Sequence, residues 1–139
     1  MTENLRVLFV CVKNGGKSQM AAGLMGRACG PDVRVDSAGT EPGAAINPLA
    51  AAVLLEVGVD ISAGTPQQLT GDLVQLADRV VVLGIQAHVV PVDGTSIEVW
   101  ETDEPSLRGI EGIERMRLIR DDIARRVGDL AINLEPRHP

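Results

Sequence analysis

Apolar residues along the chain fall into two patterns, short runs rich in Val, Leu and Ile, and longer segments in which they recur every three or four positions. The short runs predict strands over 7–12, 33–37, 79–83 and 97–100. The periodic segments predict helices over 17–29, 48–57, 69–76 and 113–134, the last with the apolar stripe Met116, Ile119, Ile123, Val127, Leu130 and Leu134.

Residues that favour helix ends agree with these boundaries. Gly30-Pro31 is expected to end the first helix, because neither residue continues one well. Asn47 precedes Pro48 in the order typical of an N-cap and a first-turn proline, and Thr70 offers a capping hydroxyl to the third helix. After the second helix, residues 59–62 are expected to return toward the sheet.

Strands that alternate with helices predict an α/β fold. We expect a single three-layer domain over 1–139, with a central four-stranded parallel sheet flanked by helices. The run Val80 to Leu83 is unbroken and suits a central strand. Ligands of such sheets bind beyond the carboxyl ends of the strands, which is where Cys11 and the loop after it fall.

Composition narrows the classes of function. The chain of 139 residues is 45% apolar and 23% charged, as in an ordinary globular protein. Its net charge of −6 disfavours nucleic acid and anionic membranes as partners. No window reaches the roughly 20 apolar residues of a membrane span, and the start does not resemble a signal peptide. We therefore expect a cytoplasmic protein in which Cys11 and Cys29 stay unpaired.

The segment from Cys11 to Ser18 has the features of an oxyanion site. A strand ends in a thiol, a turn with two glycines follows, and a cation and a hydroxyl stand at the start of a helix. Free backbone N–H groups and the positive end of the helix dipole would bind an anion and favour the thiolate form of Cys11. The candidate substrate-binding residues are Val12, Lys13, Asn14, Gly15, Gly16, Lys17 and Ser18.

Two other interpretations of this loop compete with the oxyanion site. A Walker loop would need glycine where Cys11 stands, and an aspartate after the run 80–83, where Gly84 follows. Alternatively, Cys11 could be an inert core residue, as buried cysteines usually are. The glycine-rich, cation-bearing loop directly after it favours the reactive cysteine.

The loop resembles the Cys-x5-Arg-Ser motif of low-molecular-weight protein tyrosine phosphatases and of the arsenate reductases built on that fold. The resemblance covers nearly the whole chain. It extends to Ser37-Ala38-Gly39-Thr40, Asn47-Pro48, Gly58-Val59-Asp60, Ala77-Asp78-Arg79-Val80-Val81-Val82-Leu83 and Asp103-Glu104-Pro105.

Two departures favour a small inorganic anion over a phosphate ester, and a third implies that the reducing thiol comes from another molecule. Lys17 stands where the family normally has arginine, and a lysine lacks the planar fork that matches two oxygens at once. The chain has no tyrosine, and Phe9 and Trp100 are its only aromatic residues. The segment 83–88 lacks the two cysteines that thioredoxin-coupled relatives use as a relay.

The chain is most similar to the actinobacterial arsenate reductases that use mycothiol and mycoredoxin, through its loop and the segments 102–106 and 109–117. The resemblance implies arsenate as substrate, with phosphate or sulfate as mimics, mycothiol as co-substrate, mycoredoxin as partner and no tightly bound cofactor. The alternatives are a low-molecular-weight phosphatase and a weakly catalytic oxyanion-binding protein.

Within that mechanism, Cys11 would attack arsenic or assist formation of a mycothiol adduct, with Lys17 on the anion and Ser18 hydrogen-bonded to the sulfur. Asp103 or Glu104 would act as general acid, and the sequence leaves the choice between them open.

Other polar residues are expected to have structural roles. Asn14 and Ser37 would support the loop, and Cys29 would pack. The solvated face of the last helix would carry five arginines paired with nearby Glu and Asp, namely Arg115, Arg117, Arg120, Arg125 and Arg126. His88 and His138 lack a second ligand at metal spacing, so no metal site is expected.

Overall fold

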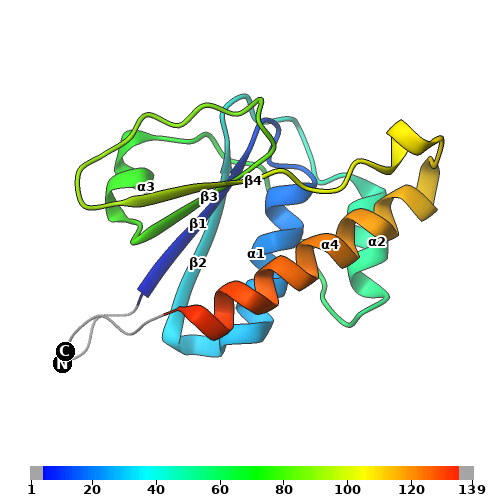
Figure 1. Cartoon of the computed structure of the whole chain (residues 1–139), viewed down its shortest axis with the longest axis horizontal. Coiled ribbons are helices and arrows are strands. Elements are labelled where there is room, and N and C mark those ends of the chain that lie inside the picture. The colour runs from blue at the N-terminus through cyan, green and yellow to red at the C-terminus, as the bar shows by residue number, and fades with distance from the viewer. Residues whose placement is uncertain (1–4, 135–139) are drawn as a thin grey trace.

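The computed structural model describes residues 5–134 and contains one parallel sheet with helices on both faces (Figure 1). Its strands are β1 (Leu5–Cys11), β2 (Val33–Gly39), β3 (Arg79–Leu83) and β4 (Ser96–Trp100), in the order β2-β1-β3-β4. Its helices are α1 (Lys17–Cys29), α2 (Pro48–Leu55), α3 (Gly71–Leu76) and α4 (Gly112–Asn133), with short 3-10 turns η1 (Gly30–Asp32) and η2 (Pro105–Arg108). This confirms the predicted four-stranded α/β fold.

Alternate residues of each central strand build two separate cores. Val7, Phe9 and Cys11 of β1 face α1, α2 and α4, whereas Leu8 and Val10 face α3 and the chain before β4. Both sets are buried because helices or loops cover each face of a parallel sheet. The result is the predicted three-layer arrangement, with the long α4 and α1 side by side on one face (Figure 1).

The helix ends follow the capping residues. Asn47 Oδ1 accepts hydrogen bonds from the N–H groups of Leu49 and Ala50, and Thr70 Oγ1 accepts one from Leu73. Gly30, with φ of +66°, ends α1 in a conformation that L side chains rarely adopt. The predicted caps are therefore confirmed, and most strand and helix boundaries differ from the prediction by one or two residues.

One segment departs from the sequence-based expectation. Helix α2 ends at Leu55, and residues 59–62 form no strand but pack within the helical layer. A Cβ added to Gly23 of α1 would lie 2.8 Å from Ile61 Cγ2 and 3.0 Å from Val59 Cγ1. The apolar residues of 59–62 thus pack against α1. A short apolar run in the sequence shows that its side chains are buried but does not show which element covers them.

The sheet order places β1 between β2 and β3. The chain passes from β1 to β2 on one side and then returns to β3 on the other side of β1, so the strand order reverses at β1. The crevice at such a switch point lies beyond the carboxyl ends of these strands. Residues after Cys11 and after Leu83 meet there and form a cleft. Among residues 5–134, no helix is long and apolar enough to cross a membrane.

Candidate functional site

The loop between β1 and α1 forms a cradle whose carbonyl groups face outward. The segment after β2 pairs with it: the N–H groups of Thr40, Glu41, Gly43 and Asn47 donate to the carbonyls of residues 11, 12, 13 and 15, at 2.7–3.1 Å. The carbonyl of Asn14 accepts from the Gln19 side chain at 3.1 Å. With its carbonyls used in this way, the loop directs N–H groups toward the cleft.

These N–H groups are available to a ligand. Within residues 5–134, no protein acceptor takes the N–H of Lys13, Gly15, Gly16 or Lys17. Lys17 is the first residue of α1, Gly16 is its N-cap, and Lys13 and Gly15 lie in the loop just before it, at the end where the helix dipole is positive. The Lys17 side chain lines the same cleft. A tetrahedral oxyanion would therefore meet several N–H donors and a cation.

Asn14 holds the loop in this shape. It is fully buried and is the one non-glycine residue with positive φ, +54°, in the described part of the chain. Its Oδ1 accepts from the N–H of Gln67 at 3.0 Å and from Gln19 Nε2 at 3.3 Å, and its Nδ2 donates to Ser18 Oγ at 2.7 Å. Asparagine tolerates this left-handed conformation better than most residues, which explains its presence here.

Two groups that can donate a hydrogen bond lie beside the Cys11 sulfur. An amide Nδ2 can only donate, so Ser18 Oγ accepts from Asn14, and its own proton is free to point at the sulfur 2.9 Å away. The N–H of Asn14 donates to Cys11 Sγ, at 3.2 Å. A nucleophilic sulfur at this position would therefore meet two hydrogen-bond donors. Cys11 is only 8% exposed, and it lines the cleft.

Glycine is required where β2 meets the loop. A Cβ added to Gly39 would lie 2.6 Å from the Val12 carbonyl oxygen and 3.0 Å from the Asn14 Cβ. The Ser37-Ala38-Gly39-Thr40 motif therefore brings one backbone against another.

Ser37, in contrast, pairs with Phe9 in the ladder, and its carbonyl accepts from Gln67 Nε2 at 2.7 Å. Within residues 5–134 its side chain makes no hydrogen bond to the loop, so the expected support from Ser37 is not what the structure shows. The residues after it support the loop instead.

The two candidate acids lie in different places. Glu104 lines the cleft together with Cys11 and Lys17, whereas Asp103 lies over α4 among acidic and basic residues of that helix. Asp103 is paired with Arg108, and this hydrogen-bonded guanidinium lowers the pKa of the Asp103 carboxyl.

Arg115 was expected on the solvated face of α4, paired with a nearby acid; it is partly exposed, and its acid is Glu104 at the cleft. Its guanidinium makes two parallel hydrogen bonds to Glu104, Nε to Oε2 and Nη2 to Oε1, both 3.0 Å. Ser106 Oγ donates to Oε2 at 2.8 Å. Hydrogen bonding by Arg115 in the first place, then by Ser106, holds the pKa of Glu104 at about 2. At neutral pH this carboxyl is ionised.

The second cysteine is far from the first. Cys29 ends α1, twelve residues after Lys17, and a helix rises 1.5 Å per residue, which places it about 18 Å along the axis from the loop. A disulfide needs Cα atoms within roughly 7 Å. Burial raises the pKa of the Cys29 thiol. Both observations agree with packing rather than exchange with Cys11.

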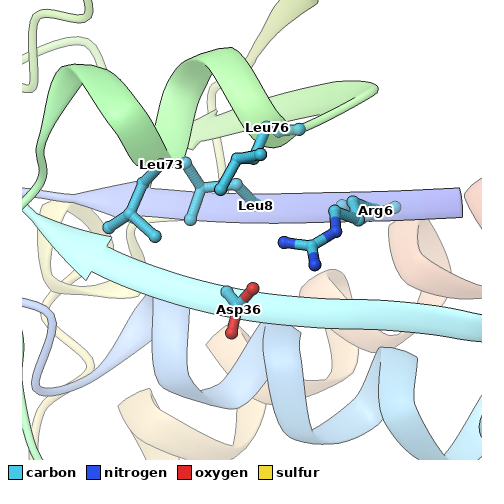
Figure 2. Close-up of a pocket in the computed structure, with 7 residues that line it drawn as sticks. Arg6, Leu8, Asp36, Leu73 and Leu76 are labelled. Carbon is cyan, nitrogen blue, oxygen red and sulfur yellow. The ribbon is translucent and has the colours of Figure 1, made fainter.

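A further feature lies outside the cleft. Figure 2 shows a small pocket near the amino end of β1, where the Arg6 guanidinium and the Asp36 carboxylate lie close to Leu8, Leu73 and Leu76.

Residues 5–134 contain no group of three His, Cys, Asp or Glu side chains that could hold a metal ion. His138 lies outside the described residues.

A cysteine hydrogen-bonded to Ser18 and to the Asn14 N–H, inside a backbone cradle at the start of a helix, defines a cysteine-based oxyanion site. Comparison of the sequence with known protein families shows which family carries this site. The chain belongs to the low molecular weight phosphotyrosine protein phosphatase family, which matches residues 6–137.

Relatives within this family are arsenate reductases. The enzyme of Bacillus subtilis is 34% identical over 137 residues, which cover 93% of this chain and 96% of that protein. The arsenate reductase of Halalkalibacterium halodurans is 35% identical over 133 residues, covering 90% and 94%.

Solved structures give the same result. A Corynebacterium glutamicum thioredoxin-dependent arsenate reductase superposes with a TM-score of 0.78 and 35% identity, over 91% of this chain and 60% of that longer chain. An arsenate reductase in its phosphate-binding state gives a TM-score of 0.81 with 29% identity, over 94% and 99%.

Proposed function

We propose that the protein is an arsenate reductase in which Cys11 acts as nucleophile and the reducing thiol comes from another molecule. The observation that carries the proposal is a complete oxyanion cradle around a single usable cysteine. The relatives named arsenate reductase support the choice of anion. The phosphate-bound neighbour supports capture of a tetrahedral anion in this fold.

The first step joins sulfur to arsenic. The Cys11 thiolate displaces water from dihydrogen arsenate, RS⁻ + H₂AsO₄⁻ → RS–AsO₃²⁻ + H₂O, with arsenic still As(V). The N–H groups of the loop and Lys17 bind the three remaining oxygens as charge builds on them. Ser18 releases its hydrogen bond to the sulfur as the thiolate is consumed.

The second step is the reduction. An incoming thiolate attacks the arsenic-bound sulfur, R′S⁻ + RS–AsO₃²⁻ → RS–SR′ + AsO₃³⁻. The S–As electron pair stays on arsenic, which becomes As(III), and arsenite takes up protons from water. The described structure offers no second thiol for this step, because Cys29 lies about 18 Å from the loop.

We propose mycothiol as the incoming thiol and mycoredoxin as the protein that restores the system. In a variant of this scheme, mycothiol itself takes the arsenate and Cys11 assists. Segment 83–88 has no cysteine, which supports an external thiol of some kind. The proposed reaction uses no tightly bound cofactor and takes place in the reducing cytoplasm.

Arsenite formation tests this function. The protein is incubated with arsenate and either mycothiol plus mycoredoxin or thioredoxin plus its reductase, and arsenite is measured. We expect turnover with the mycothiol pair and its loss in Cys11→Ser, with Cys29→Ser as control. Turnover only with thioredoxin would overturn the choice of thiol. Turnover with neither pair would overturn the reductase function.

Phosphatase activity is the second candidate, because the family as a whole is described by it. Both aromatic residues of the chain are buried, Phe9 fully and Trp100 to 7% exposure, so neither can stack on a phosphotyrosine ring. Brisk hydrolysis of p-nitrophenyl phosphate by a protein inert to arsenate would establish the phosphatase instead.

A further inference from the structure

The carboxylate that faces the oxyanion cradle is fully occupied as a hydrogen-bond acceptor. Both oxygens of Glu104 accept from Arg115, and one accepts from Ser106 as well. The two side chains of the pair are 33% and 29% exposed, so this contact is partly shielded from water at the edge of the cleft. A bidentate guanidinium contact of this kind fixes geometry as well as charge.

The two charged groups that act on Glu104 both favour its ionised form. Arg115 comes from α4 and Lys17 from α1, and both are cations. Glu111 acts on Arg115, whose pKa it raises. The adjacent Asp103 is paired with Arg108 and points away from the cleft. The site therefore contains a carboxylate where a carboxylic acid would be needed for proton donation.

This matters differently for two classes of substrate. Transfer of phosphorus from a monoester to Cys11 expels an alkoxide or phenoxide, R″O–PO₃²⁻ + RS⁻ + H⁺ → R″OH + RS–PO₃²⁻, and the proton has to come from the protein. Dihydrogen arsenate brings both protons of the water that leaves. Only the first reaction therefore depends on a proton from the site, and an acid typically speeds such a reaction by a factor of about 10² to 10⁴.

We propose that Arg115 is a positioning residue that determines specificity: by holding Glu104 as a fixed carboxylate, it withholds a general acid from phosphate monoesters and leaves the site to inorganic oxyanions. This inference rests on the proposed function and names the residue that separates it from the phosphatase alternative. Arg115 acts through Glu104 and need not touch the anion.

The first test measures the protonation of Glu104 directly. Carbon-detected NMR of the Glu104 carboxyl is followed with pH in the wild-type protein, in Arg115→Met and in Arg117→Met. Arg117 lies on the same helix but pairs with Glu56, so it is a matched control. We expect titration near pH 2–3 in the wild type and the control, and above pH 4 in Arg115→Met. Titration of wild-type Glu104 above pH 4 would overturn the proposal.

The second test compares leaving groups. At pH 5 a carboxyl with a pKa of about 2 is protonated in about 0.1% of molecules, and one with a pKa of about 4.5 in about 24%. Arg115→Met should therefore raise kcat/KM at pH 5 for phenyl phosphate, which needs an acid, at least tenfold relative to p-nitrophenyl phosphate, which needs it less. The gain should fall as pH rises and vanish in Glu104→Gln/Arg115→Met.

Parallel changes for both esters would overturn the proposal, because a structural or anion-binding role moves them together. The outcome is separate from that of the arsenite assay. A protein without arsenate turnover in any thiol system would refute the reductase function, and the titration and the leaving-group ratio would still decide the role of Arg115.

Discussion

Asn14→Ala tests whether the oxyanion loop depends on one left-handed residue. The substitution removes three side-chain hydrogen bonds, from Gln67 N–H, from Gln19 Nε2 and to Ser18 Oγ. Each is worth about 1 kcal/mol net. Alanine at φ of +54° adds about 1 kcal/mol of backbone strain. Since the partners partly rehydrate, the free energy of unfolding should fall by about 3–4 kcal/mol.

Asn14→Gly separates the two contributions. Glycine also loses the three hydrogen bonds but adopts positive φ without strain. It should be about 1 kcal/mol less destabilised than Asn14→Ala. Urea unfolding at pH 7 gives the free energies for the wild type and both variants, with equal slopes required for the comparison.

The same variants report on the cradle. Phosphate stabilises a protein that binds it by an amount that grows with the ratio of its concentration to Kd. We expect the wild-type Tm to rise with added phosphate and both Asn14 variants to lose most of this rise. A loss below 0.5 kcal/mol in Asn14→Ala, or equal losses in the alanine and glycine variants, would refute the assigned role of Asn14.

Three further predictions concern the site. Lys17→Arg should raise hydrolysis of p-nitrophenyl phosphate at least tenfold, because a guanidinium fork binds two equatorial oxygens, and unchanged kcat/KM would contradict this. Cys29→Ser should retain arsenite formation in the presence of external thiol; loss of turnover with intact folding would give Cys29 a chemical role. Because the folded-state pKa of Glu104 is about 2, against 4.5 ordinarily, its ion pair adds stability that is complete above pH 4.5 and is lost as pH falls toward 2. The difference in urea stability between the wild type and Glu104→Gln should therefore shrink between pH 5 and pH 3, and a constant difference would count against the pair.

The fold could be predicted because its signals are local. The run Val80 to Leu83 and the stripe of α4 each report burial through their own spacing, and Asn47 and Thr70 cap the helices that follow them. Residues 59–62 were expected to return toward the sheet, whereas Val59 and Ile61 pack against α1 at Gly23. Periodicity shows that a side chain is buried and does not show what covers it.

The candidate site contains residues that are contiguous in sequence and others that only the fold brings together. Cys11 and the loop after it are contiguous in sequence, so their chemistry could be inferred from residue types alone. The supports come from elsewhere: Gln67 lies 53 residues from Asn14, and Thr40 to Asn47 approach the loop only because β2 pairs with β1. Gly39 offered one signal, since a glycine at a strand end can mark close approach of two backbones.

Arg115 shows why the role of a residue can depend on a contact that residue type does not reveal. It is one of five arginines on α4. Residue type alone does not separate it from Arg117 and Arg120 on the same helix, which bind Glu56. What distinguishes Arg115 is its partner Glu104, which stands at the N-cap of η2 and lies beside the start of α4. Their contact places a cation at the cleft and keeps the Glu104 carboxyl ionised. A carboxylate beside the proline was enough to suggest a general acid, whereas its protonation depends on a partner eleven residues away. Residue type therefore identified the group in the cleft, and only the tertiary contact decides whether that group carries a proton.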